Sequence, residues 1–436
     1  MQLQNETTPR PGAGGTVRLE IEDIAYRGFG VARAGGAVHF VPGVCRGETV
    51  LAAVESVRKN FRIARILEIE TASPDRLAEP DCRVPDTSAP GRETRVPGCV
   101  YDHMLHAAEV REKAAQLRTF LVRQAGIAPD AADAALEAPC VSPKSLAYRN
   151  KAELHVGKAP DGRRTLGYIG EDNETVVDMV RCPLSVPPIS AAIAETREDP
   201  DFARWAPVGS RAVFRWSGHD GTALFVDRPG FPADDGGGAF FTEPTPVLGT
   251  LSVPARGFWQ MNGDVGAALV SAVAGKLRDD MPESLVDLYC GVGVFGLSAA
   301  KLGVKRVLGV ESGRDAVRAA RANARAHGLD GAARFECADA GRGAAKFVSA
   351  FRGPGADVLA DPPRAGLAPD VVRALAASPP RRLFYVSCAP DTLARDLKTL
   401  CGGGAFRLES ARLFDMFPRT AHFETLCVLR GPGKRP

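Results

Sequence analysis

Short apolar runs alternate with longer segments of helical pattern in the C-terminal part of the chain, from about Phe258 onward. Five apolar runs lie at residues 285–288, 307–310, 334–337, 357–360 and 383–386. The helical segment from Asp315 to His327 stops at Gly328, a residue typical of helix ends. Strands that alternate with helices form a parallel sheet covered on both faces. The pattern predicts a doubly wound, Rossmann-like α/β domain over residues 256–436.

The first part of the chain follows the two-residue period of half-buried strands. Residues 16–21 and 37–42 alternate in this way, with glycine-rich turns at residues 28–30 and 35–36. We expect a disordered tail at residues 1–14 and a small β-barrel at residues 15–72. An irregular, cysteine-containing segment at residues 73–105 follows. A β-rich central domain at residues 106–255 comes next and includes a helix from Glu109 to Gln124.

One strand segment of the predicted barrel carries Arg58, Lys59, Arg62 and Arg65 beside Phe61. Cations with an aromatic neighbour on one strand face favour contact with RNA. The same charge pattern is also typical of a solvated strand face, so both interpretations remain open.

Composition narrows the class of protein. A chain of 436 residues is long enough for several domains, and its net charge of +3 does not by itself indicate nucleic acid. Ten scattered cysteines are unlike a small disulfide-stapled secreted domain. The first residues contain no apolar segment, so no signal peptide is expected, and no stretch approaches a membrane span. These features predict a cytoplasmic enzyme with reduced thiols.

Cys388 is the strongest single candidate for chemistry. It directly follows the apolar run at residues 383–386 and Ser387, and Pro390 restricts the turn after it. The thiol is therefore expected at the carboxyl end of a strand, the edge of an open α/β sheet where ligands bind. The alternative is a small buried filler, since free cysteines are often buried.

The other strand ends carry candidates for a cofactor site. Residues 291–296, which include Gly291 and Gly293, satisfy a dinucleotide fingerprint that fits NAD and S-adenosylmethionine equally well. Glu311, at the end of the next strand, is placed for ribose hydroxyls. Asp339 could accept a hydrogen bond from an adenine amino group or cap a helix. Asp361 precedes two prolines, which stiffen the turn and hold its carboxylate at the carboxyl edge of the sheet, where ligands bind. The alternative is a turn with a purely structural role.

The joint set of motifs resembles the RNA 5-methyluridine methyltransferase family. The resemblance covers the whole chain, because residues 15–70 are similar to a TRAM RNA-binding barrel. It implies that Cys388 is the nucleophile and Glu424 the general base. It implies S-adenosylmethionine contacts from Gln260, Tyr289, Glu311, Asp339 and Asp361. The motifs that carry it are residues 148–156, 258–262, 287–295, 361–367, 387–390 and 415–424.

The chemistry of uracil methylation independently requires a thiolate and a base, the two residue types found here. A thiolate that adds to C6 makes C5 nucleophilic, and the C5 proton must later leave to a base. Without Cys388, Glu424 would be an ordinary solvated strand end. Asp361 could orient either the cofactor or the uracil. One departure is Val294, where relatives often have Asn, and it removes one side-chain contact with the cofactor.

One branch of the family holds an iron–sulfur cluster on four cysteines, and this chain matches that pattern incompletely. Cys82, Cys99 and Cys182 match three ligand positions, whereas Val96 stands at the other. Three thiolates are fewer than a four-iron four-sulfur cluster normally uses, and Cys140 is a remote substitute. A bound cluster, a zinc site and a degenerate site all remain open.

The resemblance implies a methyltransferase that makes 5-methyluridine in RNA, with 23S rRNA as the expected substrate and tRNA as the alternative. An NAD-dependent oxidoreductase would explain only the glycine fingerprint. A catalytically inactive RNA-binding protein would leave Cys388 and Glu424 without a role. The sequence indicates no protein partner and no membrane partner.

Overall fold

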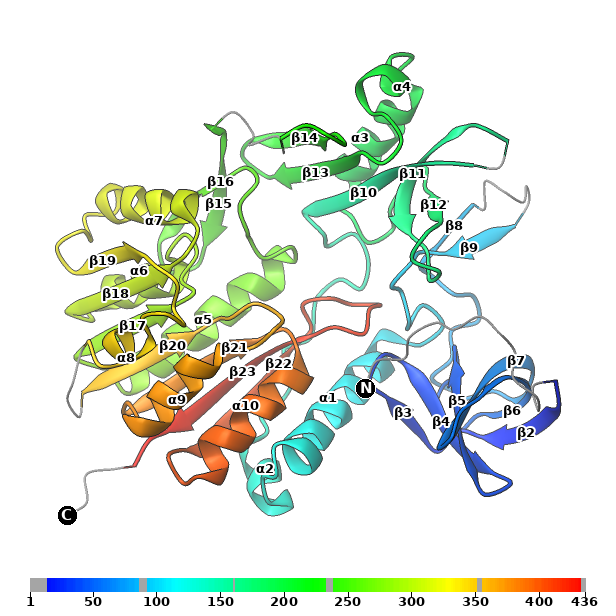
Figure 1. Ribbon diagram of the computed structural model, residues 1–436, viewed down its shortest axis with the longest axis horizontal. Coiled ribbons are helices and arrows are strands. Elements are labelled where there is room, and N and C mark those ends of the chain that lie inside the picture. The colour runs from blue at the N-terminus through cyan, green and yellow to red at the C-terminus, as the bar shows by residue number, and fades with distance from the viewer. Residues whose placement is uncertain (1–13, 86–91, 160, 233–237, 351–354, 433–436) are drawn as a thin grey trace.

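The computed structural model describes residues 14–85, 92–159, 161–232, 238–350 and 355–432. Figure 1 shows three parts: a β-barrel, a central β-rich part and an α/β part that contains the C-terminus. The tail predicted at residues 1–14 lies outside the described residues except for Gly14. None of the helices in the described ranges is long and apolar enough to cross a membrane.

The N-terminal part is a six-stranded curled sheet, as predicted for residues 15–72. Its strand order is β2-β6-β7-β5-β4-β3, and its core contains Leu19, Ile24 and Val41. The bounds are β2 Thr16–Glu20, β3 Asp23–Ala25, β4 Phe29–Ala34, β5 Ala37–Pro42, β6 Thr49–Val57 and β7 Phe61–Thr71.

The four barrel cations do not share one strand face, so this part of the prediction is wrong. Arg58 and Lys59 lie in the turn before β7. Arg62 pairs with the buried His39 across the strand register, whereas Arg65, three positions later, is on the opposite face. Arg65 also forms an ion pair with Glu55 at 2.7 Å.

A connecting segment joins the barrel to the rest of the molecule. It contains a short hairpin, the predicted helix and a second short helix. Leu117, Phe120 and Leu121 of the helical part pack into the core of the α/β part rather than into the central sheet. The bounds are β8 Arg83–Pro85, β9 Glu93–Arg95, α1 His106–Thr119, a π-helical turn Phe120–Gln124 and α2 Pro129–Ala135.

The central part is a five-stranded antiparallel sheet in the order β12-β11-β10-β13-β14, covered by α3. A separate hairpin, β15–β16, packs on the α/β part through Leu251 and Val253. The bounds are β10 Lys151–Lys158, β11 Arg164–Ile169, β12 Val176–Asp178, α3 Pro187–Glu198, α4 Phe202–Trp205, β13 Arg211–Ser217, β14 Gly221–Asp227, β15 Phe240–Thr245 and β16 Gly249–Pro254.

The C-terminal part is the predicted doubly wound α/β domain. Its seven-stranded sheet has the order β19-β18-β17-β20-β21-β23-β22, and β23 is antiparallel to both neighbours. The five apolar runs are confirmed as strands, and the predicted helix is α7. The bounds are α5 Gly263–Asp279, β17 Ser284–Leu288, α6 Val294–Leu302, β18 Arg306–Glu311, α7 Arg314–Ala326, β19 Ala333–Cys337, α8 Ala344–Val348, β20 Ala356–Ala360, α9 Pro369–Ala377, β21 Arg382–Ser387, α10 Pro390–Gly402, β22 Arg407–Phe414 and β23 Glu424–Arg430.

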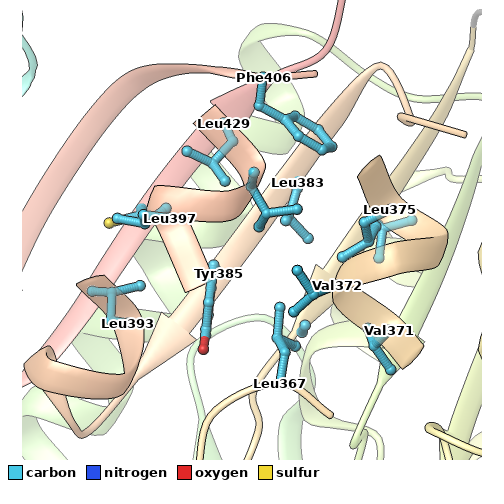
Figure 2. Close-up of a cluster of buried hydrophobic side chains, with 14 of the residues drawn as sticks. Leu367, Val371, Val372, Leu375, Leu383, Tyr385, Leu393, Leu397, Phe406 and Leu429 are labelled. Atoms are coloured by element: carbon cyan, nitrogen blue, oxygen red, sulfur yellow. The ribbon is translucent and has the colours of Figure 1, made fainter. Parts of the chain in front are cut away.

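Strand order places the ligand crevice of this domain. The chain runs from β17 to β18 on one side and returns to β20 on the other, so the direction reverses between β17 and β20. Ligands of open α/β sheets bind at such a switch point, outside the carboxyl ends of the strands. Below it, α9 and α10 pack on β21 through Leu375, Leu383 and Leu397 (Figure 2). This packed layer fixes the strand ends that carry the candidate residues.

Candidate active site

Cys388 and Glu424 lie opposite each other at one end of the β21–β23 pair. Ser387 is the last residue of β21, and it pairs with Thr425 in the antiparallel register. Cys388 follows Ser387 and Glu424 precedes Thr425, so the register continues directly to these two residues. Residues opposite each other on antiparallel strands project to the same face about 5 Å apart. The pairing therefore brings the predicted nucleophile and the predicted base together.

Asp361 joins this pair from the neighbouring strand. Ala360, the residue before it, pairs with Leu288 on one side and with Tyr385 on the other. Asp361 is therefore next to Tyr289 at the edge of the sheet and one strand away from Cys388. Glu424 is buried, and its Oε2 has no hydrogen-bond partner among the described residues.

Burial shifts the pKa of each candidate upward, and the charges of the site modify this shift for Cys388 and Glu424. Burial raises the pKa of Cys388 to about 12, Glu424 and Asp361 add to the effect, and Arg364 opposes it. Burial and Asp361 together hold the pKa of Glu424 well above its usual range, again opposed by Arg364. Burial raises the pKa of Asp361 to about 7. Carboxyl groups whose pKa is raised in this way are suited to proton transfer.

A first cavity, of about 620 Å³, lies at the carboxyl ends of β17 to β20. Tyr289, Glu311 and Asp339 all line it. Backbone amides fix the Glu311 carboxylate, because Gly291 N donates to Oε2 at 3.2 Å and Gly313 N donates to Oε1 at 2.7 Å. Asp339 Oδ1 accepts a hydrogen bond from Arg342 N at 3.0 Å. This bond is similar to the helix cap that the sequence offered as the alternative role of Asp339. The Asp339 side chain thus stabilises a turn while it lines the cavity.

A second cavity, of about 680 Å³, meets the first at Tyr289, which lines both. Gln260, Gly291 and Asp361 line it together with Phe258. The backbone oxygen of Gln260 accepts from Asn150 Nδ2 at 3.0 Å, which ties the segment before α5 to the central part. Six of the seven predicted cofactor residues therefore line one or both of two neighbouring cavities, and Gly293 lies in the turn between β17 and α6.

The turn between β17 and α6 has a backbone that few residues adopt. Tyr289 has φ 62°, Gly291 has φ 54° and Gly293 has φ 88°, all in the left-handed region. A Cβ atom at Gly293 would lie 2.9 Å from the Phe335 ring, so only glycine fits there. Beneath the turn, Asp287 Oδ2 accepts from Gly296 N at 2.8 Å. Burial raises the pKa of Asp287 to about 8, and its Oδ1 has no partner among the described residues.

A buried ion network holds the loop that leads into Glu424. This loop, residues 415–423, extends from the sheet toward the segment before α1 (Figure 1). Lys113 Nζ of α1 donates to Glu109 Oε1 at 2.7 Å, to Asp415 Oδ1 at 3.0 Å and to the Phe417 oxygen at 3.2 Å. Arg419 N donates to the same Glu109 oxygen at 2.7 Å. Helix α1 thus fixes the approach of the loop to the candidate base.

Comparison with known proteins gives the family. A family model described as tRNA (Uracil-5-)-methyltransferase matches residues 252–431. The 23S rRNA (uracil(1939)-C(5))-methyltransferase RlmD of Pseudomonas putida is 33% identical over 451 residues, which cover 97% of this chain and 95% of the relative. The chain belongs to the RNA (uracil-C5)-methyltransferase family. The resemblance inferred from the motifs is confirmed, and the oxidoreductase alternative is ruled out.

Two further proteins are similar over nearly the whole length. An RNA methyltransferase of Synechocystis described as uncharacterized is 27% identical, and the match covers 97% of each chain. The crystal structure of a tRNA (uracil-54, C5)-methyltransferase of Pyrococcus abyssi in complex with S-adenosyl-L-homocysteine superposes with a TM-score of 0.69 at 25% identity. That match covers 94% of this chain and 99% of the other. The RNA (uracil-C5)-methyltransferase architecture therefore extends to the barrel and the central part.

The front cysteines are not arranged as a metal site in the described part of this RNA (uracil-C5)-methyltransferase. Cys82 and Cys99 form a disulfide with a Cα–Cα distance of 6.5 Å, contrary to the expectation of reduced thiols throughout. Cys182 shares their hydrophobic core, where Tyr168 Oη lies 3.5 Å from its sulfur. Val96, at the second ligand position, is buried in the same core. Among the described residues, no group of three His, Cys, Asp or Glu side chains is arranged to hold a metal, so the residues do not fit an iron–sulfur cluster.

Sequence reasoning gave no role to two residues that shape the site. Arg364 is the cation that lowers the pKa values of both Cys388 and Glu424. Its place after Asp361 in the motif at residues 361–367 was a usable signal. Tyr26 of the barrel packs against Phe423, next to Glu424, with ring centroids 6.4 Å apart. No local pattern marks Tyr26, because only the packing of the barrel on α1 brings it there.

Proposed function

We propose that this enzyme methylates C5 of a uridine in 23S rRNA with S-adenosylmethionine, through a covalent adduct of Cys388 and with Glu424 as the base. The observation that carries the proposal is the register of β21 and β23, which aligns Cys388 and Glu424 at the carboxyl edge of the sheet. The two cavities share Tyr289, and the second is also lined by Asp361, which is one strand away from Cys388. A thiol, a base and a ligand crevice are therefore within one site.

The cavity linings fit S-adenosylmethionine. Glu311, whose carboxylate is fixed by two backbone amides, would accept from ribose hydroxyls, and Asp339 would accept from the adenine amino group. Gln260, Tyr289 and Asp361 would hold the remainder of the molecule where the two cavities meet. The open space above Gly291, where an added Cβ would meet no atom within 4 Å, leaves room for it. When bound, S-adenosylmethionine supplies an electrophilic methyl group on a positively charged sulfur.

The residues of the chain account for the other steps. The Cys388 thiolate adds to uracil C6 and makes C5 nucleophilic, so that C5 can accept the methyl group. Glu424 then removes the C5 proton, and the electron pair of that C–H bond restores the ring double bond as the thiolate leaves. Arg364 favours the thiolate because it lowers the pKa of Cys388. The target uridine must leave its stack to reach the thiol.

The choice of 23S rRNA rests on the relatives. The RlmD proteins of Pseudomonas putida and Pseudomonas aeruginosa, at 33% and 32% identity, are described as 23S rRNA enzymes. A tRNA substrate is the second candidate, favoured by the family model and by the Pyrococcus abyssi structure. Comparing 5-methyluridine in 23S rRNA and tRNA from cells with and without this gene would separate them. A cytoplasmic location remains a prediction.

Replacement of Cys388 tests the mechanism. Cys388→Ala should reduce methyl transfer at least 1000-fold, roughly the loss typical of removing a covalent nucleophile, and leave cofactor affinity unchanged. Wild-type protein should form a stable adduct with RNA that carries 5-fluorouridine, because fluorine cannot leave as a proton. Cys401→Ala, a half-buried thiol on α10, is the matched control and should trap RNA normally. Turnover by Cys388→Ala within tenfold of wild type would show that another nucleophile acts.

A further inference from the structure

A side chain of the N-terminal barrel belongs to the core of the catalytic domain. Tyr26 lies in the turn between β3 and β4, yet it packs with the α/β core cluster and not with the barrel core. Its ring contacts Phe120 edge-on with centroids 5.3 Å apart, and Phe423 at 6.4 Å. Because Phe423 directly precedes Glu424, this turn of the barrel reaches the catalytic edge.

Several contacts hold the turn in this position. Gln116 of α1 donates through Nε2 to the backbone oxygens of Ile24 at 3.2 Å and Ala25 at 3.3 Å. A Cβ at Gly28 would lie 3.0 Å from the Val100 side chain, so the chain packs closely on the connecting segment. Arg27 has φ 75°, an unusual conformation for a residue with a side chain. The turn is therefore fixed before any RNA binds.

The Tyr26 hydroxyl is influenced by the charges of the reacting residues. After burial, the charges that act on the pKa of the Tyr26 hydroxyl come from Asp391, Arg27, Arg364 and Cys388, so the hydroxyl lies within electrostatic range of the thiol. None of the described residues forms a hydrogen bond with this hydroxyl, and Tyr26 remains partly exposed. A phenylalanine would supply the same ring contacts. The hydroxyl is thus not required for packing and is available to a ligand.

Positive charge gathers at the same place. His422, two residues before Glu424, has its pKa lowered to about 4 by burial and by the charges of Arg364, Lys113, Arg149 and Arg27. Arg27 is exposed and forms no ion pair with any described residue. Lys113 is already paired with Glu109 and Asp415. The exposed Arg27 is the cation that can attract an anionic ligand, and the anion that accompanies a uridine in RNA is its phosphate.

We propose that Tyr26 and Arg27 form an RNA subsite of the barrel beside Cys388. In this subsite the Tyr26 hydroxyl forms a hydrogen bond with the bound RNA, and Arg27 binds a phosphate that flanks the target uridine. This subsite rests on the proposed RNA methylation at Cys388 and adds a role for the barrel within the reaction site. The barrel then does more than raise general RNA affinity. It fixes the nucleotide next to the flipped uridine relative to the thiol.

Conservative variants test the subsite without disturbing the fold. Tyr26→Phe keeps the ring contacts, and it should lower kcat/KM for RNA about tenfold, mainly through KM, as expected when one hydrogen bond to a charged group is removed. Arg27→Gln should lower kcat/KM similarly and reduce the salt slope of RNA binding by roughly 0.7 to 0.9. Cofactor affinity and melting temperature should not change. Arg18→Gln, an exposed barrel arginine on β2 that pairs with Glu70, is the matched control.

Each outcome decides for or against the subsite. Values of kcat/KM within twofold of wild type for both Tyr26→Phe and Arg27→Gln would overturn it. A loss confined to melting temperature or cofactor affinity would also overturn it, because it would show a packing role only. Trapping of 5-fluorouridine RNA by wild type separates this failure from that of the proposed function. If wild type traps RNA and both variants act normally, only the subsite is wrong.

Discussion

At the scale of single residues, the site opposes the ionisation of its own nucleophile. The pKa of Cys388 is raised to about 12 by burial, by Glu424 and by Asp361, so the thiol is protonated at neutral pH before ligands bind. A positively charged ligand near Asp361 would offset the carboxylate charge and favour the thiolate. The enzyme would then activate the thiol only when the cofactor is in place. Such a coupling would keep the thiol unreactive until the cofactor binds.

Glu424→Gln separates the two halves of the reaction. The variant should still add the thiol and accept the methyl group but fail to remove the C5 proton, so a covalent protein–RNA adduct should accumulate on ordinary uridine. Because Glu424 raises the pKa of Cys388, the variant should also ionise its thiol at lower pH. Denaturing gels report the adduct, and the rate of alkylation as a function of pH reports the thiol. Normal turnover without an adduct would assign proton removal to another group.

The residues of the site were predictable to different degrees. Cys388 and Asp361 each follow a strand and Glu311 ends one, so the rule for open α/β sheets places them at one edge without a structure. Glu424 is the first residue of an antiparallel strand, and only the register of Ser387 with Thr425 shows that it lies opposite the thiol. Long-range packing of this kind leaves no mark on the local sequence.

At the scale of elements, helix α1 links the barrel to the catalytic loop. Its helical pattern was visible in the sequence, but its buried charges were not predictable as a network, because their partners are about 300 positions away. Burial alone would lower the pKa of Lys113, but Glu109 and Asp415 raise it above its usual value. Burial likewise would raise the pKa of Asp415, and Lys113 and His106 bring it below its usual value. Lys113 is therefore charged and fully paired.

Lys113→Met tests this network. The variant removes the cation that joins the buried Glu109 and Asp415 and leaves them only their contacts with Arg419 and His106. The free energy of unfolding should therefore fall by about 3 to 5 kcal/mol. Lys276→Met is the matched control, because Lys276 forms a partly exposed pair with Glu137 at 2.6 Å. Its loss should be below about 1 kcal/mol. Urea unfolding measures both, and equal losses would show that the network does not stabilise the fold.

At the scale of the whole molecule, the three parts were recognisable but their packing was not. The barrel, the central sheet and the doubly wound domain follow from periodicity and turn residues. The sequence did not reveal that residues 117–121 and the β15–β16 hairpin join the core of the catalytic domain. The prediction of a single cationic face was also wrong, because successive side chains of β7 point to opposite sides of the sheet. Arg62 and Arg65 therefore lie on different faces.

The barrel should still supply part of the electrostatic affinity for RNA, and its exposed cations test this. Lys59 and Arg65 are exposed, and the exposed pair of Arg65 with Glu55 costs little to exchange for a phosphate. Replacing both by Gln should flatten the plot of log affinity against log salt by roughly 0.7 to 0.9 for each phosphate that is no longer neutralised. Turnover of a short RNA hairpin at saturation should change less.

The control for this test lies on the other side of the molecule. Arg318 and Arg325 are exposed on α7, which Figure 1 places at the opposite end from the barrel. Replacing both by Gln removes the same net charge, so any general effect of charge on RNA binding should be equal in the two variants. A larger change of slope for Lys59 and Arg65 would locate phosphate contacts on the barrel. Equal slopes in both variants and in wild type would assign these barrel cations to a solvated surface.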